Sequence, residues 1–119
     1  MPNRRRTAPK PLLLETFRYF YAGGRIDPAV EGSPMTGQMY VEYFIPRKRR
    51  SPYPIVMVHG GSQTGTNFTG TPDGREGWAQ YFVRRGHAVY VVDQVARGRS
   101  AHFSTLSRTS CSSSRGSSA

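Results

Sequence analysis

Two short apolar runs on either side of a helix-like segment constrain the fold of this chain most. The first run, Ile55–Val58, and the second, Ala88–Val92, are almost unbroken in apolar character. Strands that are covered on both faces have this composition. Two strands joined through a helix over this length require a parallel pair with a right-handed crossover. Residues 54 to 100 therefore predict one βαβ unit.

The helix between the two runs is predicted from its caps and its apolar spacing. Asp73 is the expected N-cap, and Glu76 completes a capping box three residues later. Trp78 and Phe82 lie four residues apart, with Ala79 and Val83 beside them, and predict one apolar face. Gly86 is expected to follow the helix as its C′ residue. If Trp78 is buried, its loss should cost about 3–5 kcal/mol.

Two further strands are predicted ahead of this unit. Aromatic residues recur at alternate positions over 13–21, which favours a strand, and Gly23-Gly24 is expected to end it. Prolines and glycines over 25–37 indicate a loop, and residues 38–45 again have strand composition. An antiparallel pairing of these two segments gives an α/β chain with about four strands and one helix.

The composition changes toward both ends. Residues 1–12 are basic and contain three prolines, and residues 104–119 are rich in serine and arginine. Such segments cannot bury enough apolar surface to offset the entropy of ordering. We therefore expect two disordered arms around one folded domain at 13–103.

The charge of the chain allows two interpretations. Seventeen Lys and Arg against seven Asp and Glu give a net charge of +10, and four of the basic residues form the run Arg47–Arg50. Solvated ends and one basic loop account for most of this excess. No zinc-finger spacing or aromatic RNA-binding pattern accompanies it, so nucleic acid is not the expected partner. The alternative is a basic, non-catalytic module that binds nucleic acid or a partner protein.

Several classes of site and location are not indicated by the sequence. Cys111 is the single cysteine, which excludes an internal disulfide and a multi-cysteine metal site. No metal or cofactor site is predicted. No apolar run reaches the ~18–20 residues of a membrane span, and no convincing signal peptide is found. This pattern favours the cytoplasm without determining the compartment.

Two polar loops follow the predicted parallel strands, where open α/β sheets bind their ligands. The first begins at His59 and contains Gly60, Gly61 and Ser62, whose N–H groups could donate hydrogen bonds to an oxyanion. A tight turn without a ligand explains this loop equally well. The candidate residues of the second loop are Asp93, Gln94, Arg97 and Ser100.

With these motifs in place, the chain resembles the N-terminal part of an α/β-hydrolase-fold protein from a bacterial and fungal esterase-like branch. The resemblance covers roughly residues 13–103. It implies an eight-stranded sheet, a Ser–Asp/Glu–His triad and acyl transfer on small carboxylic esters, with Gly60, Gly61 and Ser62 in the first half of the oxyanion hole. The matching segments are Gly37–Val41, Pro54–Gly60, Thr71–Arg75, Gly77-Trp78, Asp93-Gln94 and Arg97–Ser100.

The sequence departs from this family in several ways. It contains no Gly-x-Ser-x-Gly nucleophile elbow, so no catalytic residue is assigned, and we expect a truncated, inactive hydrolase.

His59 is expected to order its loop, and Ser100 to be a turn residue. Ala96 stands where the family often has glycine. In the family's strand order, Ile55–Val58 would lie at an open edge, which predicts self-association.

Overall fold

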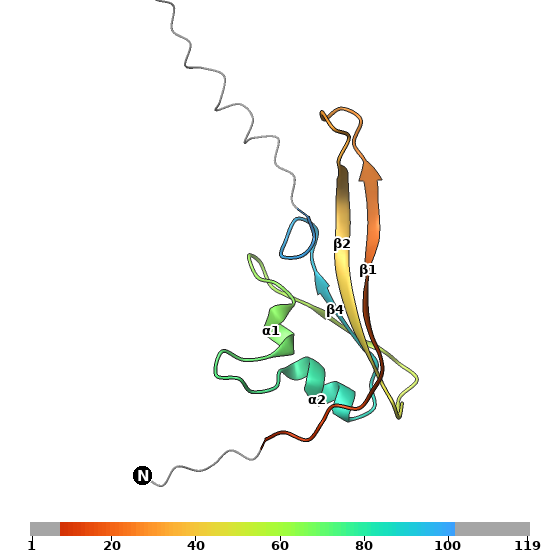
Figure 1. The fold of residues 1–119 in the computed structure, drawn as a ribbon, viewed down its shortest axis with the longest axis vertical. Helices are drawn as coiled ribbons and strands as arrows, with labels where there is room; N and C mark the ends of the chain where they lie inside the picture. The colour runs from red at the N-terminus through yellow and green to blue at the C-terminus, as the bar shows by residue number, and fades with distance from the viewer. Residues whose placement is uncertain (1–7, 102–119) are drawn as a thin grey trace, which may run out of the picture.

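The computed structural model describes residues 8–101, which form a four-stranded mixed sheet with helices beside it (Figure 1). The strand order is β1-β2-β4-β3. β1 and β2 pair antiparallel, as do β2 and β4, whereas β3 and β4 are parallel. The predicted α/β class, hairpin and parallel pair are therefore confirmed. The elements are β1 (Leu14–Ile26), β2 (Met35–Pro46), β3 (Ile55–Val58), α1 (Thr66–Thr69), α2 (Trp78–Arg84) and β4 (Val89–Asp93).

The β1–β2 hairpin is longer than predicted. Gly23 and Gly24 were expected to end the first strand, but β1 continues to Ile26 and β2 begins at Met35. Both glycines have positive φ, yet Gly23 still pairs with Gln38 in the ladder. The predicted loop over 25–37 therefore shortens to residues 27–34. Cross-strand pairing continues through a glycine conformation that other residues rarely adopt.

Helix α2 begins later than predicted, and Asp73 does not cap it. The N-cap is Gly77, whose N–H is bonded to Gln80 Oε1 at 3.0 Å. Asp73 instead accepts hydrogen bonds from Thr71 and Arg75 within its own turn. A Cβ on Gly77 would lie 2.2 Å from the Phe68 carbonyl oxygen, so close packing selects glycine at this position.

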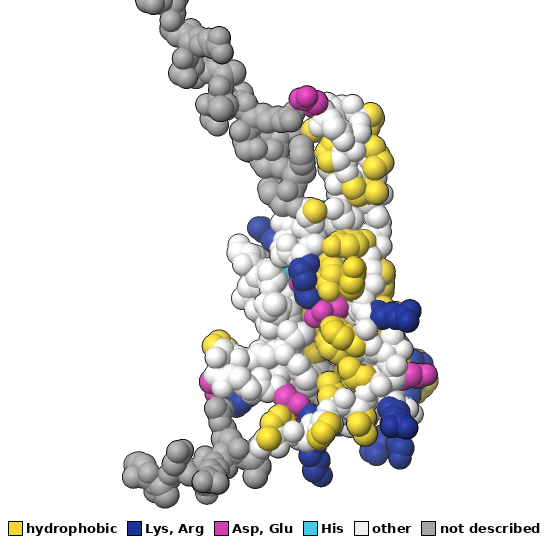
Figure 2. Space-filling model, in the orientation of Figure 1, with side chains coloured by type: hydrophobic (Ala, Val, Ile, Leu, Met, Phe, Trp, Pro, Cys, Tyr) yellow, Lys and Arg dark blue, Asp and Glu magenta, His cyan; other side chains and the backbone are white. Residues whose placement is uncertain are grey.

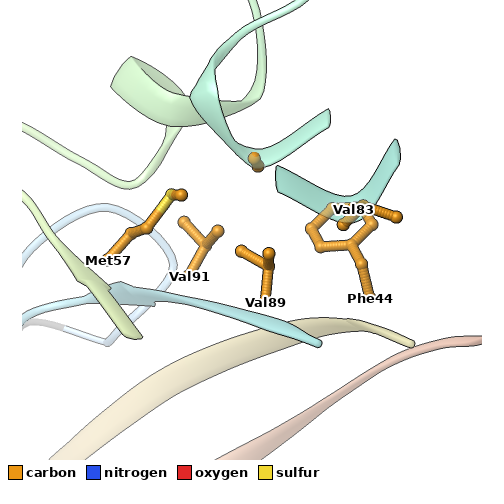
Figure 3. Close-up of a cluster of buried hydrophobic side chains, with 6 residues drawn as sticks. Phe44, Met57, Val83, Val89 and Val91 are labelled. Atoms are coloured by element: carbon orange, nitrogen blue, oxygen red, sulfur yellow. The ribbon is translucent and has the colours of Figure 1, made fainter. Parts of the chain in front are cut away.

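The hydrophobic core lies between α2 and the sheet (Figure 3). Of the residues predicted for the apolar face, α2 buries Ala79 and Val83 and packs Phe82 partly against the core, whereas Trp78 is 63% exposed. The prediction that Trp78 is a core residue is therefore wrong. The buried side chains of α2 are small because this face of the helix packs against two valines of β4. The buried cluster comprises Phe44, Met57, Ala79, Val83, Val89 and Val91.

β3 lies at the edge of the sheet, where the sequence predicted it. The Ile55 N–H is bonded to the Ala88 carbonyl at 2.8 Å, so the alternating ladder directs the backbone groups of Val56 and Val58 away from β4. The side chains of these two valines are 59% and 56% exposed. An apolar strand with free backbone groups is therefore accessible along one side.

The ends of the chain are only partly described. Residues 1–7 and 102–119 lie outside the described range, so most of both predicted arms and Cys111 carry no structural account. Within the N-terminal arm, Leu12 packs against the core cluster. The domain boundaries at 13 and 103 remain predictions. Among residues 8–101, no helix is long and apolar enough to cross a membrane.

Candidate functional site

His59 connects the end of β3 to the end of β4. Its buried ring accepts the Gln94 N–H at Nε2, at 2.9 Å, while the Gln94 side-chain amide donates to the His59 carbonyl at 2.7 Å. Because Nε2 is an acceptor, the neutral ring carries its proton on Nδ1, which lies 2.7 Å from the Gly60 carbonyl oxygen. Both ring nitrogens are thus engaged in ordering the two loops, which leaves neither for a general base.

Asp93 anchors the second loop from within the sheet. Its side chain is 1% exposed, and its oxygens accept the N–H of Gly65 at 2.7 Å and the N–H of Arg99 at 2.8 Å. The Arg99 side chain adds a bond from Nε at 2.9 Å. Burial alone raises the pKa of Asp93, but the donors of Arg99 and Gly65 outweigh it and hold the pKa below its usual value. The carboxylate is therefore ionised at neutral pH.

Arg99 and Glu42 are central to this anchor, although neither is among the predicted site residues. Arg99 Nη1 lies 2.7 Å from Glu42 Oε2, and its guanidinium stands 4.2 Å from the centre of the Tyr40 ring. Hydrogen bonds to Asp93 and to Glu42 raise the pKa of Arg99. The sequence does contain an indication of this pair, because Glu42 is a lone glutamate inside an apolar strand and a buried carboxylate requires a cationic partner.

Ser100 closes the second loop as a structural bridge. Its hydroxyl is fully buried, donates to the Asp93 carbonyl at 2.5 Å and accepts the Tyr40 N–H at 2.8 Å. Arg97 is exposed and contributes backbone bonds, including its N–H to the Gln94 carbonyl at 2.9 Å. Ala96 adopts a φ of 62°, a conformation that favours glycine. This explains why the family often places glycine at that position.

The loop after β3 carries the backbone donors predicted for an oxyanion. The Gly60 N–H is already bonded to Gln63 Oε1 at 3.2 Å, and Gln63 is held in turn by the Asn67 side chain at 2.6 Å. Gly61 and Ser62 are exposed, and within residues 8–101 their N–H groups have no hydrogen-bond partner. The loop thus offers two free donors beside a third that is occupied.

Most of the predicted residues lie in one connected unit at the carboxyl ends of β3 and β4. The His59–Gln94 contacts join the first loop to the second, and Asp93 reaches the first loop through Gly65. The side chain of Arg97 takes no part. In the described part of the chain, no group of three or more His, Cys, Asp and Glu residues is placed to hold a metal ion.

Comparison with known proteins relates the chain to part of a lipase and to part of an esterase. It is 43% identical over 89 residues to the probable secreted lipase phiG of Fungal sp. (strain ATCC 74256), which is 75% of this chain and 22% of that protein. A solved structure of a novel bacterial esterase matches with a TM-score of 0.69 and 40% identity, over 82% of this chain and 33% of that one. The chain thus spans about a fifth of the length of the curated relative. No family model matches the sequence.

Proposed function

We propose a function for this chain from the premise that it is an esterase- and lipase-like part of an α/β-hydrolase fold. In this proposal the loop after β3 supplies half of the oxyanion hole of a carboxylic-ester hydrolase. The observation that carries it is the pair of exposed N–H groups of Gly61 and Ser62, which have no partner within residues 8–101 and lie at the end of a strand that His59 holds in place. Donors fixed at one point stabilise a developing oxyanion strongly.

The chemistry follows from what these donors can do. When a serine hydroxyl adds to an ester carbonyl, a C–O bond forms, the carbonyl electron pair moves to oxygen, and the hydroxyl proton passes to a general base that later protonates the leaving alcohol. The Gly61 and Ser62 N–H groups would stabilise that charge until the C–O bond to the leaving alcohol breaks. The sequence contains no Gly-x-Ser-x-Gly elbow, and Ser100 is buried in structural bonds. The nucleophile would therefore come from outside this sequence, and we expect the chain alone to be inactive.

Two measurements test this proposal on the 119-residue chain. With p-nitrophenyl butyrate we expect no turnover above the buffer rate, and turnover abolished by a serine-directed phosphonylating reagent would contradict the expected inactivity. In an amide NMR titration with butyrate, the Gly61 and Ser62 signals should shift, while the occupied Gly60 N–H should shift least. Shifts that are absent, or largest at Gly60, would refute the oxyanion assignment.

We also propose that the open edge of β3 pairs with β3 of a second copy. The edge is apolar, its backbone groups at Val56 and Val58 face outward, and no strand within residues 8–101 covers it. Edges of this kind recruit further strands. Two identical edges pair antiparallel about a two-fold axis, so the association closes at a dimer. A monomer by sedimentation velocity at micromolar concentration would contradict it.

A further inference from the structure

A groove of about 680 Å³ lies at the end of the sheet opposite to the candidate site. We call it the basal groove, and its walls are the segment 10–13, the segment 46–50 and the end of α2 at Val83 and Arg84. Its volume falls within the usual range for small-molecule sites, roughly 300–1,000 Å³.

Backbone contacts hold the walls of the basal groove together. Arg84 donates to the carbonyls of Lys10 and Pro11, at 2.5 and 3.3 Å, which ties the N-terminal segment to α2. The Arg50 N–H is bonded to the Gly86 carbonyl at 2.9 Å, which ties the basic loop to the end of the same helix. The groove is therefore formed by segments that are connected to one another.

The basal groove carries an uncompensated positive charge. Of its five cationic side chains, Arg84 is paired with Glu76. The other four have no acidic partner within residues 8–101, and they gather at the end of the molecule where β2 and α2 finish (Figure 2). Clustered like charges favour an anionic ligand. The four are Lys10, Arg47, Lys48 and Arg50.

The same groove has an apolar side. The exposed Leu13 and the half-buried Leu12 form this side, whereas the lining residues Val83 and Pro46 are themselves buried. An inorganic anion would leave this surface in water, whereas a hydrocarbon chain would cover it and gain free energy in proportion to the buried area. Among the described residues that line the groove there is no aromatic side chain, so they provide no stacking platform for nucleic-acid bases.

We propose that the basal groove binds the anion of a fatty acid. The carboxylate interacts with Arg47 and Lys48, and the hydrocarbon chain lies along Leu12 and Leu13. This site is independent of the proposed function, because the groove lies at the opposite end of the sheet from Gly61 and Ser62. Failure of either proposal leaves the other unaffected.

The test is a titration of the 119-residue chain with dodecanoate below its aggregation concentration, followed by calorimetry. We expect saturable 1:1 binding. Replacing two cations in Arg47→Gln/Lys48→Gln should weaken it at least about tenfold, which is the scale of one hydrogen bond to a charged group. Leu13→Ser should weaken dodecanoate binding without affecting a weak association with inorganic phosphate. The circular dichroism spectra of all variants should match that of the parent chain.

A matched control removes the same charge elsewhere. Arg18→Gln/Arg25→Gln lowers the net charge by the same amount at two exposed positions of β1 and should change the dissociation constant less than about twofold, because both sites are far from the groove. Equal losses in the two double variants would overturn the proposal. So would phosphate or an uncharged amphiphile that binds as tightly as dodecanoate. Binding only to phosphatidylglycerol vesicles, or only to duplex DNA, would also overturn it.

Discussion

Arg99→Ala removes a cation that faces two buried carboxylates. Asp93 is 1% exposed and Glu42 is 8% exposed, and Arg99 contacts both at 2.9 and 2.7 Å. Breaking a buried pair costs about 3–5 kcal/mol because a charge is left without compensation. The Arg99 side chain is 37% exposed, so water screens part of the pair, and Asp93 keeps the backbone N–H groups of Gly65 and of residue 99. We therefore expect no more than the lower end, about 3 kcal/mol at pH 7.

The dependence on pH distinguishes this mechanism from a simple loss of packing. In the parent chain, burial raises the pKa of Asp93, but the Arg99 and Gly65 donors outweigh it, so the folded pKa is depressed. Its stabilisation is present above the unfolded pKa of about 3.9 and is lost as the pH falls through the folded value. In the variant, fewer donors oppose burial and the folded pKa of Asp93 rises. The difference in stability should therefore be largest at pH 7 and smaller near pH 4.

Urea denaturation followed by circular dichroism at the two pH values measures this effect. Arg75→Ala is the matched control, because Arg75 and Asp73 form an ion pair in which both side chains are more than half exposed. Water screens such a pair, so its midpoint should hardly move at either pH. The reasoning is refuted if both variants lose equal stability, or if the loss in Arg99→Ala grows on acidification.

Three further predictions concern the loops and the sheet edge. Ser100→Ala should lower the free energy of unfolding by about 1–3 kcal/mol in urea, because the buried Tyr40 N–H loses its acceptor; an unchanged midpoint would contradict the bridging role. Gly65→Ala should destabilise far more than Gly61→Ala in thermal melts, because a Cβ at 65 would lie 2.6 Å from Val91 and one at 61 meets open space; similar melting temperatures would be inconsistent with this packing. Val56→Lys should shift sedimentation toward monomer, while Val95→Lys, an exposed loop control, should not; a dimer in both would exclude the edge.

Much of the fold follows from local patterns in the sequence. The unbroken apolar runs at Ile55–Val58 and 88–92 require a parallel pair across a helix, and the structure pairs them in that way. Alternating aromatics indicate the hairpin, since period-2 patterns depend only on neighbouring positions. The two polar loops are predicted at the carboxyl ends of the two apolar strands, so the candidate residues follow from the sequence alone.

The predictions that the structure contradicts have a common cause, which is competition between local and tertiary contacts. Asp73 has a side chain suited to capping a helix, but it accepts hydrogen bonds from Thr71 and Arg75 instead. The helix begins after Gly77, where close packing against Phe68 requires glycine. Trp78 has the hydrophobicity of a core residue, but Ala79 and Val83 are buried against the sheet with Phe82 packed partly against the same cluster, and Trp78 is left exposed.

Periodicity and turn chemistry along the chain are enough to predict the succession of the four strands and helix α2, the parallel pair and the two loops. Which polar groups meet depends instead on the tertiary structure. Arg99 lies 57 positions from Glu42, and Ser100 lies 60 positions from Tyr40. No spacing rule joins residues so far apart. They come together because antiparallel pairing of β2 with β4 brings Tyr40 opposite Asp93, and a buried carboxylate there requires a donor from whatever the fold places beside it.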